Sequence, residues 1–268
     1  MSARQMTSPH ALTASLAALM VVQCALGLLL PGQYRDPEWI KAAWFGNDCV
    51  TLVVAVPLVV VASWLARRGS IRGLLLWFGL LGYCVYNYAY YLFGAALNAF
   101  FAIYVASFVA SVITLILALS RTDVTVLAAG FQRKAPIRIL SGYLIFVGLV
   151  LACVWLTMWG AYAFAGKPTP VEPEAFKLVA ALDLSLIVTT FVAGGSLLWR
   201  RAAWGYVIAA IGSIQGALYL LVLSLNSFVA IHRNLVKAPG ELPAWGILAA
   251  LTTAAAVLLL RDVHETTQ

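Results

Sequence analysis

The chain alternates between long apolar runs and short segments that hold most of its polar and charged residues. Eight of the runs reach the roughly 20 residues that an α-helix needs to cross the hydrocarbon core of a membrane. We therefore expect one domain, residues 1–268, built as an all-α bundle of eight transmembrane helices. The predicted spans are 10–31, 48–66, 71–92, 97–119, 138–164, 175–199, 203–230 and 242–260.

Composition supports a membrane location. Of the 268 residues, 63% are hydrophobic and only 10% are charged, whereas soluble domains have about 45–50% and about 25%. So few polar side chains could not cover the molecule in water. The net charge of +7 does not indicate nucleic acid binding, because the basic residues form no groove or arm and stand instead at the ends of apolar runs. Membrane lipid is the expected partner.

The basic residues fall in every second connection between the predicted spans. The alternate connections hold mixed charges or none. Because short loops that are rich in Lys and Arg stay in the cytoplasm, we expect both termini to be cytoplasmic in a cell membrane, with a bacterial inner membrane as the expected location. The basic residues that set this orientation are Arg4, Arg67, Arg68, Arg72, Arg121, Arg133, Lys134, Arg138, Arg200, Arg201 and Arg261.

Two parts of the chain suggest an internal repeat. In each, an aspartate, Asp48 or Asp183, precedes an apolar run, an Arg-Arg hairpin follows, and a tyrosine, Tyr86 or Tyr219, lies at the same distance beyond the second arginine. One interpretation is two parallel four-helix halves, 1–120 and 138–268, as occur among transporters. The other is that any two basic hairpins between apolar helices look alike. The intervening loop, 121–137, is either a short amphipathic segment on the inner face of the membrane or a flexible linker.

Polar side chains gather on one face of the third predicted helix. Tyr83, Tyr86, Asn87 and Tyr90 follow the i, i+3/i+4 spacing that places residues on one stripe. Buried tyrosine and asparagine side chains need hydrogen-bond partners away from lipid. We therefore predict a polar, aromatic cavity in the outer half of the bundle. Its predicted ligand-binding residues are Tyr83, Tyr86, Asn87, Tyr90, Asn98, Asp183, Gln215, Tyr219 and Asn226.

Asp183 is the most informative single residue, because apolar residues flank it on both sides. An ionised Asp at the centre of a membrane helix costs about 2.5–3.5 kcal/mol, so we expect it to face the interior. A ligand or proton role and a structural hydrogen bond are both open. Asp48 lies nearer the membrane surface, where we expect it to cap the start of the second helix. It is also the second candidate catalytic carboxyl group. Trp155 and Trp159 either line the same cavity or belong to the interfacial belt or the core.

Several kinds of chemistry have no support in the sequence. The four cysteines, at positions 24, 49, 84 and 153, form no C-x-x-C pair, and no group of His, Cys and carboxylate residues has metal-ligand spacing. A phosphate loop and a nucleophile elbow are also missing from the sequence. We therefore expect neither a metal ion nor a cofactor.

Three stretches of the chain resemble bacterial polytopic membrane proteins to which no activity is assigned. They are "GND…TLVVAVPLVVVASWLARRGSIRGLLLWFGLLGY…YNYAYYLFGAALN", "ALDLSLIV…LLWRRAAWGYVIA" and "ELPAWGILAAL". The resemblance implies the eight-helix architecture and says nothing about a substrate.

Three functions remain open from the sequence. The first is a carrier or binding protein for a small amphipathic or lipid-like molecule. The second is an intramembrane enzyme that acts on a prenyl, sterol-like or other lipid substrate, with a buried Asp as acid or base. The third is an accessory or assembly subunit without a ligand.

Overall fold

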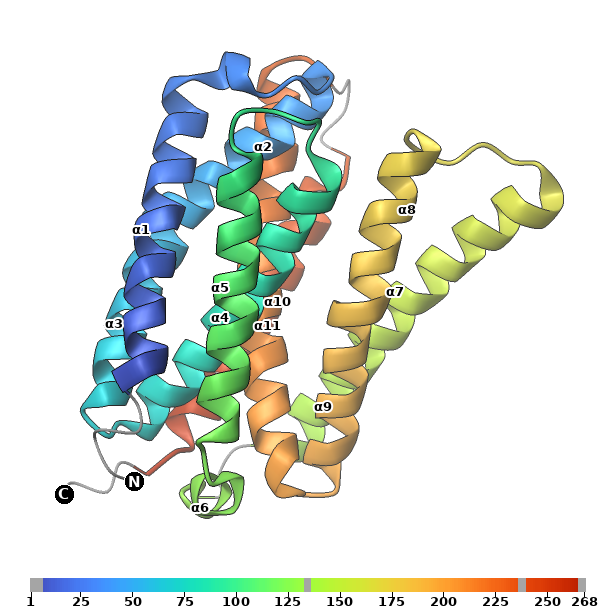
Figure 1. Ribbon diagram of the computed structural model, residues 1–268. Coiled ribbons are helices and arrows are strands. Elements are labelled where there is room, and N and C mark those ends of the chain that lie inside the picture. Colours follow the sequence, from blue (N-terminus) through green and yellow to red (C-terminus); the bar gives the residue numbers. More distant parts are fainter. Residues whose placement is uncertain (1–6, 133–135, 236–239, 265–268) are drawn as a thin grey trace.

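The computed structural model describes residues 7–132, 136–235 and 240–264, and within these residues it contains helices but no strand (Figure 1). Seven helical segments are long and apolar enough to cross a membrane. The protein is therefore an all-helical, multi-pass membrane protein by the length and composition of its helices. These seven segments are Ser8–Leu29, Glu38–Arg67, Phe101–Ser120, Ile137–Ala165, Pro173–Trp199, Ala203–His232 and Leu242–Arg261.

Successive long helices run in opposite directions through the bundle (Figure 1). Two of the long segments are each interrupted by a wider, π-helical turn, named η3 and η4 here. The elements are α1 (Thr7–Leu29), η2 (Pro31–Gln33), α2 (Glu38–Val50), η3 (Thr51–Ala55), α3 (Val56–Arg67), α4 (Ile71–Gly94), α5 (Phe101–Ser120), α6 (Val124–Ala129), α7 (Ile137–Ala165), α8 (Pro173–Leu182), η4 (Asp183–Val188), α9 (Thr189–Trp199), α10 (Ala203–His232) and α11 (Leu242–Arg261).

Helix α4 is the predicted crossing that does not appear among the seven. It has 24 residues, which span about 36 Å at about 1.5 Å per residue, so its length is sufficient. Its tyrosines and Asn87 lower its mean hydropathy. The same helix lies at the centre of the bundle, where it packs against α3, α5 and α10 and buries most of its side chains. The polar stripe predicted on this helix therefore faces protein.

The start of the second span was predicted wrongly. The helix begins at Glu38, after Pro37, and not near residue 48. Pro37 suits a helix start because its ring fixes φ. The first turns of α2 contain the ion pair between Lys41 and Glu38 at 3.0 Å. These charged residues interrupt the apolar run, so hydropathy alone did not predict that the helix begins so early. Asp48 consequently lies well inside the helix, so its predicted role as a helix cap is also wrong.

The two π-helical turns lie beside the two buried aspartates. Pro57 has no N–H group to donate to the carbonyl of Val53, and η3 ends just before the helix turn that contains this proline. The second turn, η4, begins at Asp183 itself and contains no proline. Turns of this kind often occur at functional sites, so both carboxyl groups are candidate functional groups.

One end of the bundle collects the arginine-rich hairpins. The α3–α4 and α9–α10 connections, α6, the start of α1 and the end of α11 all lie there (Figure 1). We call it the basic end, defined by Arg67, Arg68, Arg200, Arg201 and Arg261, and we call the opposite end the far end. Three of the predicted basic residues, Arg4, Arg133 and Lys134, lie outside the described residues.

The loop after α5 contains the short helix α6 (Val124–Ala129). The carboxylate of Asp123 caps it by accepting hydrogen bonds from the Thr125 hydroxyl at 2.6 Å and from the backbone N–H groups of Thr125 and Val126. These bonds hold the pKa of Asp123 below its usual value. Val124 and Leu127 are buried, so α6 is packed on the basic end of the bundle.

Glycines on α9 allow it to approach two neighbouring helices closely. A Cβ atom at Gly194 would lie 2.9 Å from the backbone nitrogen of Ala209 on α10, and one at Gly195 would lie 2.9 Å from the carbonyl oxygen of Ser141 on α7. Small residues bring helix backbones together in this way in membrane bundles. As a result, α7, α9 and α10 are tightly packed toward the basic end.

Candidate functional site

Asp183 lies where three helices meet. The residue is 1% exposed, and its carboxylate accepts hydrogen bonds from the Tyr86 hydroxyl on α4 at 2.7 Å, the Trp155 indole N–H on α7 at 3.0 Å and the Tyr219 hydroxyl on α10 at 3.1 Å. The rings of Tyr86 and Tyr219 meet edge to face, with centroids 5.0 Å apart. The described residues provide no ion-pair partner for this carboxylate, so neutral donors alone stabilise it.

Asp48 forms a second cluster of the same kind. It is fully buried and accepts hydrogen bonds from the Tyr34 hydroxyl at 2.7 Å, the Tyr91 hydroxyl at 2.7 Å and the Gln23 side-chain amide at 2.8 Å. An added Cβ atom at Gly27 would lie 2.6 Å from the Tyr34 hydroxyl, so the absence of a side chain at Gly27 makes room for this network. Gln23 and Tyr34 were not among the predicted site residues, because single polar residues give no spacing signal.

The two clusters are built alike. In each, the aspartate lies on the second helix of its half, a nitrogen donor comes from the first helix (Gln23 or Trp155) and a tyrosine hydroxyl comes from the third (Tyr91 or Tyr219). The pattern from which the repeat was predicted paired Tyr86 with Tyr219, whereas both of these tyrosines bind Asp183 and Tyr91 takes the corresponding place at Asp48. The superposition of the two halves stays a prediction.

Tyr83 and Asn87 are not part of the Asp183 cluster. The Tyr83 hydroxyl shares a hydrogen bond of 2.8 Å with the Thr51 hydroxyl, and the Asn87 amide donates to the same oxygen at 3.4 Å. Both side chains therefore bind α4 to the π-helical turn η3. The predicted stripe on α4 divides between two surroundings, since Tyr86 reaches Asp183 and its neighbours reach Thr51.

Tyr90 and Asn98 also have local partners. The Tyr90 ring packs on the Trp44 ring, with centroids 4.7 Å apart. The Asn98 side chain accepts a hydrogen bond from the backbone N–H of Phe100 at 2.8 Å, which shapes the turn before α5. These contacts are structural, and a ligand role for either residue stays a prediction.

The predicted ligand-binding residues of α10 lie in different surroundings. Gln215 is buried, and its amide oxygen would lie 2.9 Å from a Cβ atom added at Gly82 on α4. Asn226, in the amide orientation that satisfies both of its polar atoms, donates to the backbone carbonyls of Ala43 at 3.1 Å and Val222 at 3.2 Å. Of the nine predicted residues, the hydrogen bonds described here bring together Tyr86, Asp183 and Tyr219.

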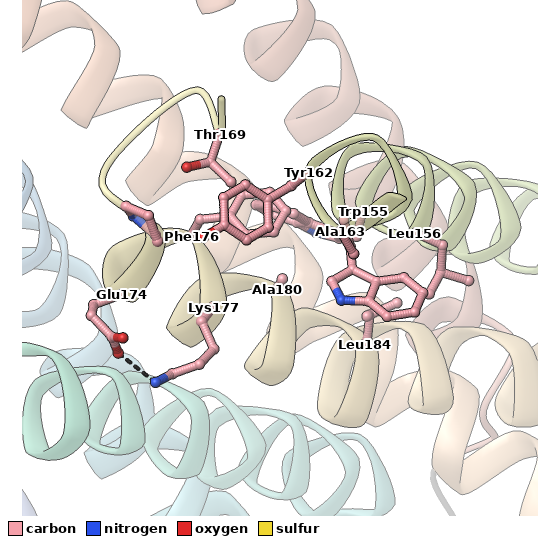
Figure 2. A pocket seen from close by; sticks show the side chains of 12 residues that line it. Trp155, Leu156, Tyr162, Ala163, Thr169, Glu174, Phe176, Lys177, Ala180 and Leu184 are labelled. Carbon is pink, nitrogen blue, oxygen red and sulfur yellow. Dashed lines mark hydrogen bonds and ion pairs between the residues drawn. The ribbon is translucent and has the colours of Figure 1, made fainter. Parts of the chain in front are cut away.

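A pocket of about 520 Å³ lies between α7 and α8 (Figure 2). Helix α7 packs against α9 and η4 toward the basic end and leans away from α8 toward the far end (Figure 1). None of the nine predicted ligand-binding residues lines this pocket. Its aromatic walls are Trp155, Trp159, Tyr162 and Phe176.

The pocket changes in polarity along its length. Glu174 and Lys177, which form an ion pair, line it near the start of α8, and Leu156 and Leu184 line it further along the two helices (Figure 2). Glu174 and Leu184 are ten residues apart, which corresponds to about 15 Å along a helix. The pocket is therefore amphipathic, with its charged part toward the far end of the bundle.

Trp155 connects the pocket with the buried carboxylate. Its ring lines the pocket and meets the Phe176 ring edge to face, with centroids 5.2 Å apart, while its N–H group donates to Asp183. Trp155, Trp159 and Tyr162 follow i, i+4, i+7 spacing, a helical stripe that was present in the sequence. Its partner face on α8 could not be recognised, because one phenylalanine among apolar residues gives no signal.

Replacing Trp155 with phenylalanine tests this connection. The ring contact with Phe176 is retained but Asp183 loses one donor, so we expect the free energy of unfolding in detergent to fall by about 1–2 kcal/mol. Trp159→Phe is the matched control, because Trp159 is 51% exposed and makes no described hydrogen bond to Asp183. Equal stability losses in the two variants would contradict the role assigned to the indole N–H.

The site as a whole combines an amphipathic pocket with a buried carboxylate behind one of its walls. The described residues contain no group of three or more His, Cys, Asp or Glu side chains that could hold a metal ion. Comparisons of the chain with protein-family models, with curated proteins and with solved structures found no match. The geometry of the site is therefore the basis for inferring its function.

Proposed function

We propose that the chain is an integral membrane protein that binds a small amphipathic or lipid-like molecule between α7 and α8. The observation that carries the proposal is the pocket of about 520 Å³ with aromatic walls, a charged part and an aliphatic part. Small-molecule sites commonly have about 300–1,000 Å³ and few polar groups. A head group would lie near Glu174 and Lys177, and an apolar chain would extend toward Leu156 and Leu184.

The membrane placement belongs to the same proposal. With α4 as an eighth crossing, the two arginine hairpins and the chain ends would be cytoplasmic, and the pocket would lie in the outer half of the membrane. Pocket-lining Trp159 and Tyr162 are about half exposed, so a membrane-dissolved ligand would enter sideways between α7 and α8. This position differs from the central cavity that the polar stripe predicted.

Single cysteines in a background without native thiols test the topology. We expect a membrane-impermeant thiol reagent to label cysteines at Leu97 and Lys167 in intact cells, and cysteines at Arg68 and Arg200 only after permeabilisation. Leu97 follows α4, so its labelling tests whether this helix crosses the membrane. A reagent that labels positions 97 and 68 from the same side would exclude α4 as a span.

Filling the pocket tests the binding function. We expect mass analysis of the purified protein in mild detergent to find a small molecule that Ala163→Trp no longer retains, because Ala163 lines the pocket and is exposed. Ala165→Trp is the control, since Ala165 is also an exposed residue near the end of α7 and does not line the pocket. The same molecules at the same occupancy in all three proteins would refute the site. Counterflow in proteoliposomes would then show whether the bound molecule is also carried across the membrane.

The two other functions make different demands on the site. An enzyme that uses Asp183 as acid or base needs its carboxyl group at the substrate, but Asp183 does not line the pocket and Trp155 stands between them. An accessory subunit needs no specific small molecule, so the retention experiment separates it from a binding protein. The geometry favours binding.

A further inference from the structure

We propose that the basic end of the bundle holds a binding site for the head group of an anionic phospholipid, formed by Arg138, Arg200 and Arg201. The basic end lies opposite the end that holds Glu174 and Lys177 (Figure 1). The site therefore goes beyond the binding function proposed above and does not depend on the ligand between α7 and α8. Three features support it: the backbone at Arg201, the unpaired charges of the three arginines and the apolar surface beside them.

Arg201 stands at a position of the helix end that favours glycine. Helices α3, α9 and α10 all end with a backbone N–H group that bonds back to a carbonyl five residues earlier: Ser70 to Leu65 at 3.1 Å, Ala202 to Leu197 at 3.0 Å and Leu235 to Ala230 at 2.9 Å. The residue just before each of these N–H groups must take a left-handed backbone conformation. It is Gly69 (φ 86°) after α3, Asn234 (φ 58°) after α10 and Arg201 (φ 55°) after α9. Glycine and asparagine adopt this conformation most readily, so the arginine strains its hairpin.

Membrane orientation does not explain an arginine at this position. A basic residue contributes to orientation from any position in a short loop, and Arg200 already places a positive charge at the end of α9, where it also complements the helix dipole. Neither effect needs a second arginine at the one position of the hairpin where a side chain strains the backbone. Such strain is typical of functional positions. The side chain of Arg201 is therefore best explained by a partner outside the chain.

The three arginines share one corner of the bundle. A Cβ atom at Gly142 on α7 would lie 3.9 Å from the Trp199 ring at the end of α9. Arg138 is one turn before Gly142 on the same face of α7, so it lies beside Arg200. All three arginines are exposed, and none of them forms a hydrogen bond or an ion pair with another described residue.

Acidic residues do not balance these charges. Asp123 and Asp262 are the acidic residues at the basic end in the part of the chain that the structure describes, and neither is paired with the three arginines. Asp123 caps α6, and Asp262 is buried. The first turns of α7 and α10 contain no acidic residue. Because the guanidinium fork fits phosphate oxygens and basic clusters beside membrane helices bind anionic head groups, a phosphate group suits this corner.

The surroundings favour a lipid over a soluble phosphate. Trp199 and Trp204, which flank the two hairpin arginines in the sequence, are 52% and 46% exposed, and Ile139, next to Arg138, is 71% exposed. Tryptophan side chains prefer the level of the lipid head groups, and an exposed isoleucine on a membrane helix can contact acyl chains. A zwitterionic head group would bring its own cation close to the arginines. A head group with a net negative charge is therefore preferred.

Native mass spectrometry of the full-length protein in mild detergent tests the site. It measures the binding of added phosphatidylglycerol, with phosphatidylcholine of the same acyl chains as the reference. We expect the unchanged protein to bind phosphatidylglycerol more tightly. We expect Arg201→Gly to weaken this binding about fivefold, as the loss of one arginine near a membrane surface implies, and to leave phosphatidylcholine binding unchanged. Arg138→Ala should have a similar effect.

Arg68→Ala is the matched control. It removes the same charge from the other arginine hairpin, where Arg68 already lies over the Trp64 ring, 3.9 Å from its centroid. We expect this variant to bind phosphatidylglycerol as the unchanged protein does. A general attraction between anionic lipids and the basic end would instead weaken binding equally in Arg68→Ala and Arg201→Gly, and that result would overturn the site.

Stability provides a second readout, with the opposite sign. Glycine relieves the strain of the left-handed backbone, so we expect Arg201→Gly to raise the denaturant midpoint of unfolding while it weakens lipid binding. A purely structural arginine would lower the midpoint when replaced, and that outcome would contradict the proposal. Unchanged phosphatidylglycerol binding in Arg201→Gly would also overturn it, as would displacement of the lipid by inorganic phosphate. The retention experiment with Ala163→Trp tests the pocket separately.

Discussion

Replacing Asp48 with alanine is expected to lower the free energy of unfolding by about 3 kcal/mol, at about 1 kcal/mol for each buried donor that loses its acceptor. The three donors are the hydroxyl groups of Tyr34 and Tyr91 and the amide of Gln23. Asp48 is fully buried, so water does not replace the carboxylate without rearrangement of the core. Denaturant unfolding in detergent micelles, followed by circular dichroism, measures the change.

Asp48→Asn is the matched comparison. Its amide oxygen still accepts hydrogen bonds, and its NH₂ group can donate to a tyrosine hydroxyl that reverses its role. We expect Asp48→Asn to lose less than half as much stability as Asp48→Ala. Val53→Ala serves as a surface control on the same helical segment, because Val53 is 71% exposed. An alanine variant as stable as the unchanged protein would show that these hydrogen bonds contribute nothing.

Gly205→Ala is the second substitution with a large expected effect. A Cβ atom at this position would overlap the backbone of Leu197 and Leu198 and would lie 2.6 Å from the carbonyl oxygen of Leu197. Backbone atoms cannot move aside as a flexible side chain can, so the α9–α10 hairpin must open. We expect a loss of about 3 kcal/mol in the free energy of unfolding.

Gly160→Ala is the control for the backbone effect. Gly160 lies inside α7, and a Cβ atom there would meet nothing within 4 Å. Since glycine in a helix interior is less favourable than alanine by roughly 0.5–1 kcal/mol, we expect Gly160→Ala to be neutral or slightly stabilising. If both alanine variants have the same stability, the close approach of α9 and α10 does not limit packing at Gly205.

Much of the fold could be predicted because the membrane restricts what a chain can do. A lipid-exposed segment must satisfy its own backbone hydrogen bonds, and a helix does so. Seven of the predicted spans coincide with the apolar helices of the structure to within a few residues, apart from the start of the second. That start was misplaced because α2 extends beyond the apolar run, through turns that contain Glu38 and Lys41.

The candidate site was predicted less well. Hydrophobic and polar spacing indicated that Tyr86, Asp183 and Tyr219 face the interior, and the structure joins them by hydrogen bonds. Spacing along one helix cannot tell which neighbouring helix lies opposite, so Asn87 was assigned to the same cavity although it bonds to Thr51. The pocket depends on the angle between α7 and α8, which local sequence does not encode.

The sequence by itself determined that the chain forms membrane-length helices, where most of them begin and end, and that polar groups on α4, α8–α9 and α10 cannot face lipid. These properties follow from local hydropathy and periodicity, which act on each segment separately. Only the tertiary structure decided that the polar groups of α4 divide among Asp48, Asp183 and Thr51, and that a pocket opens beside Trp155. Such pairings depend on contacts between helices far apart in the chain, set by glycine packing and by donors that must each find one acceptor.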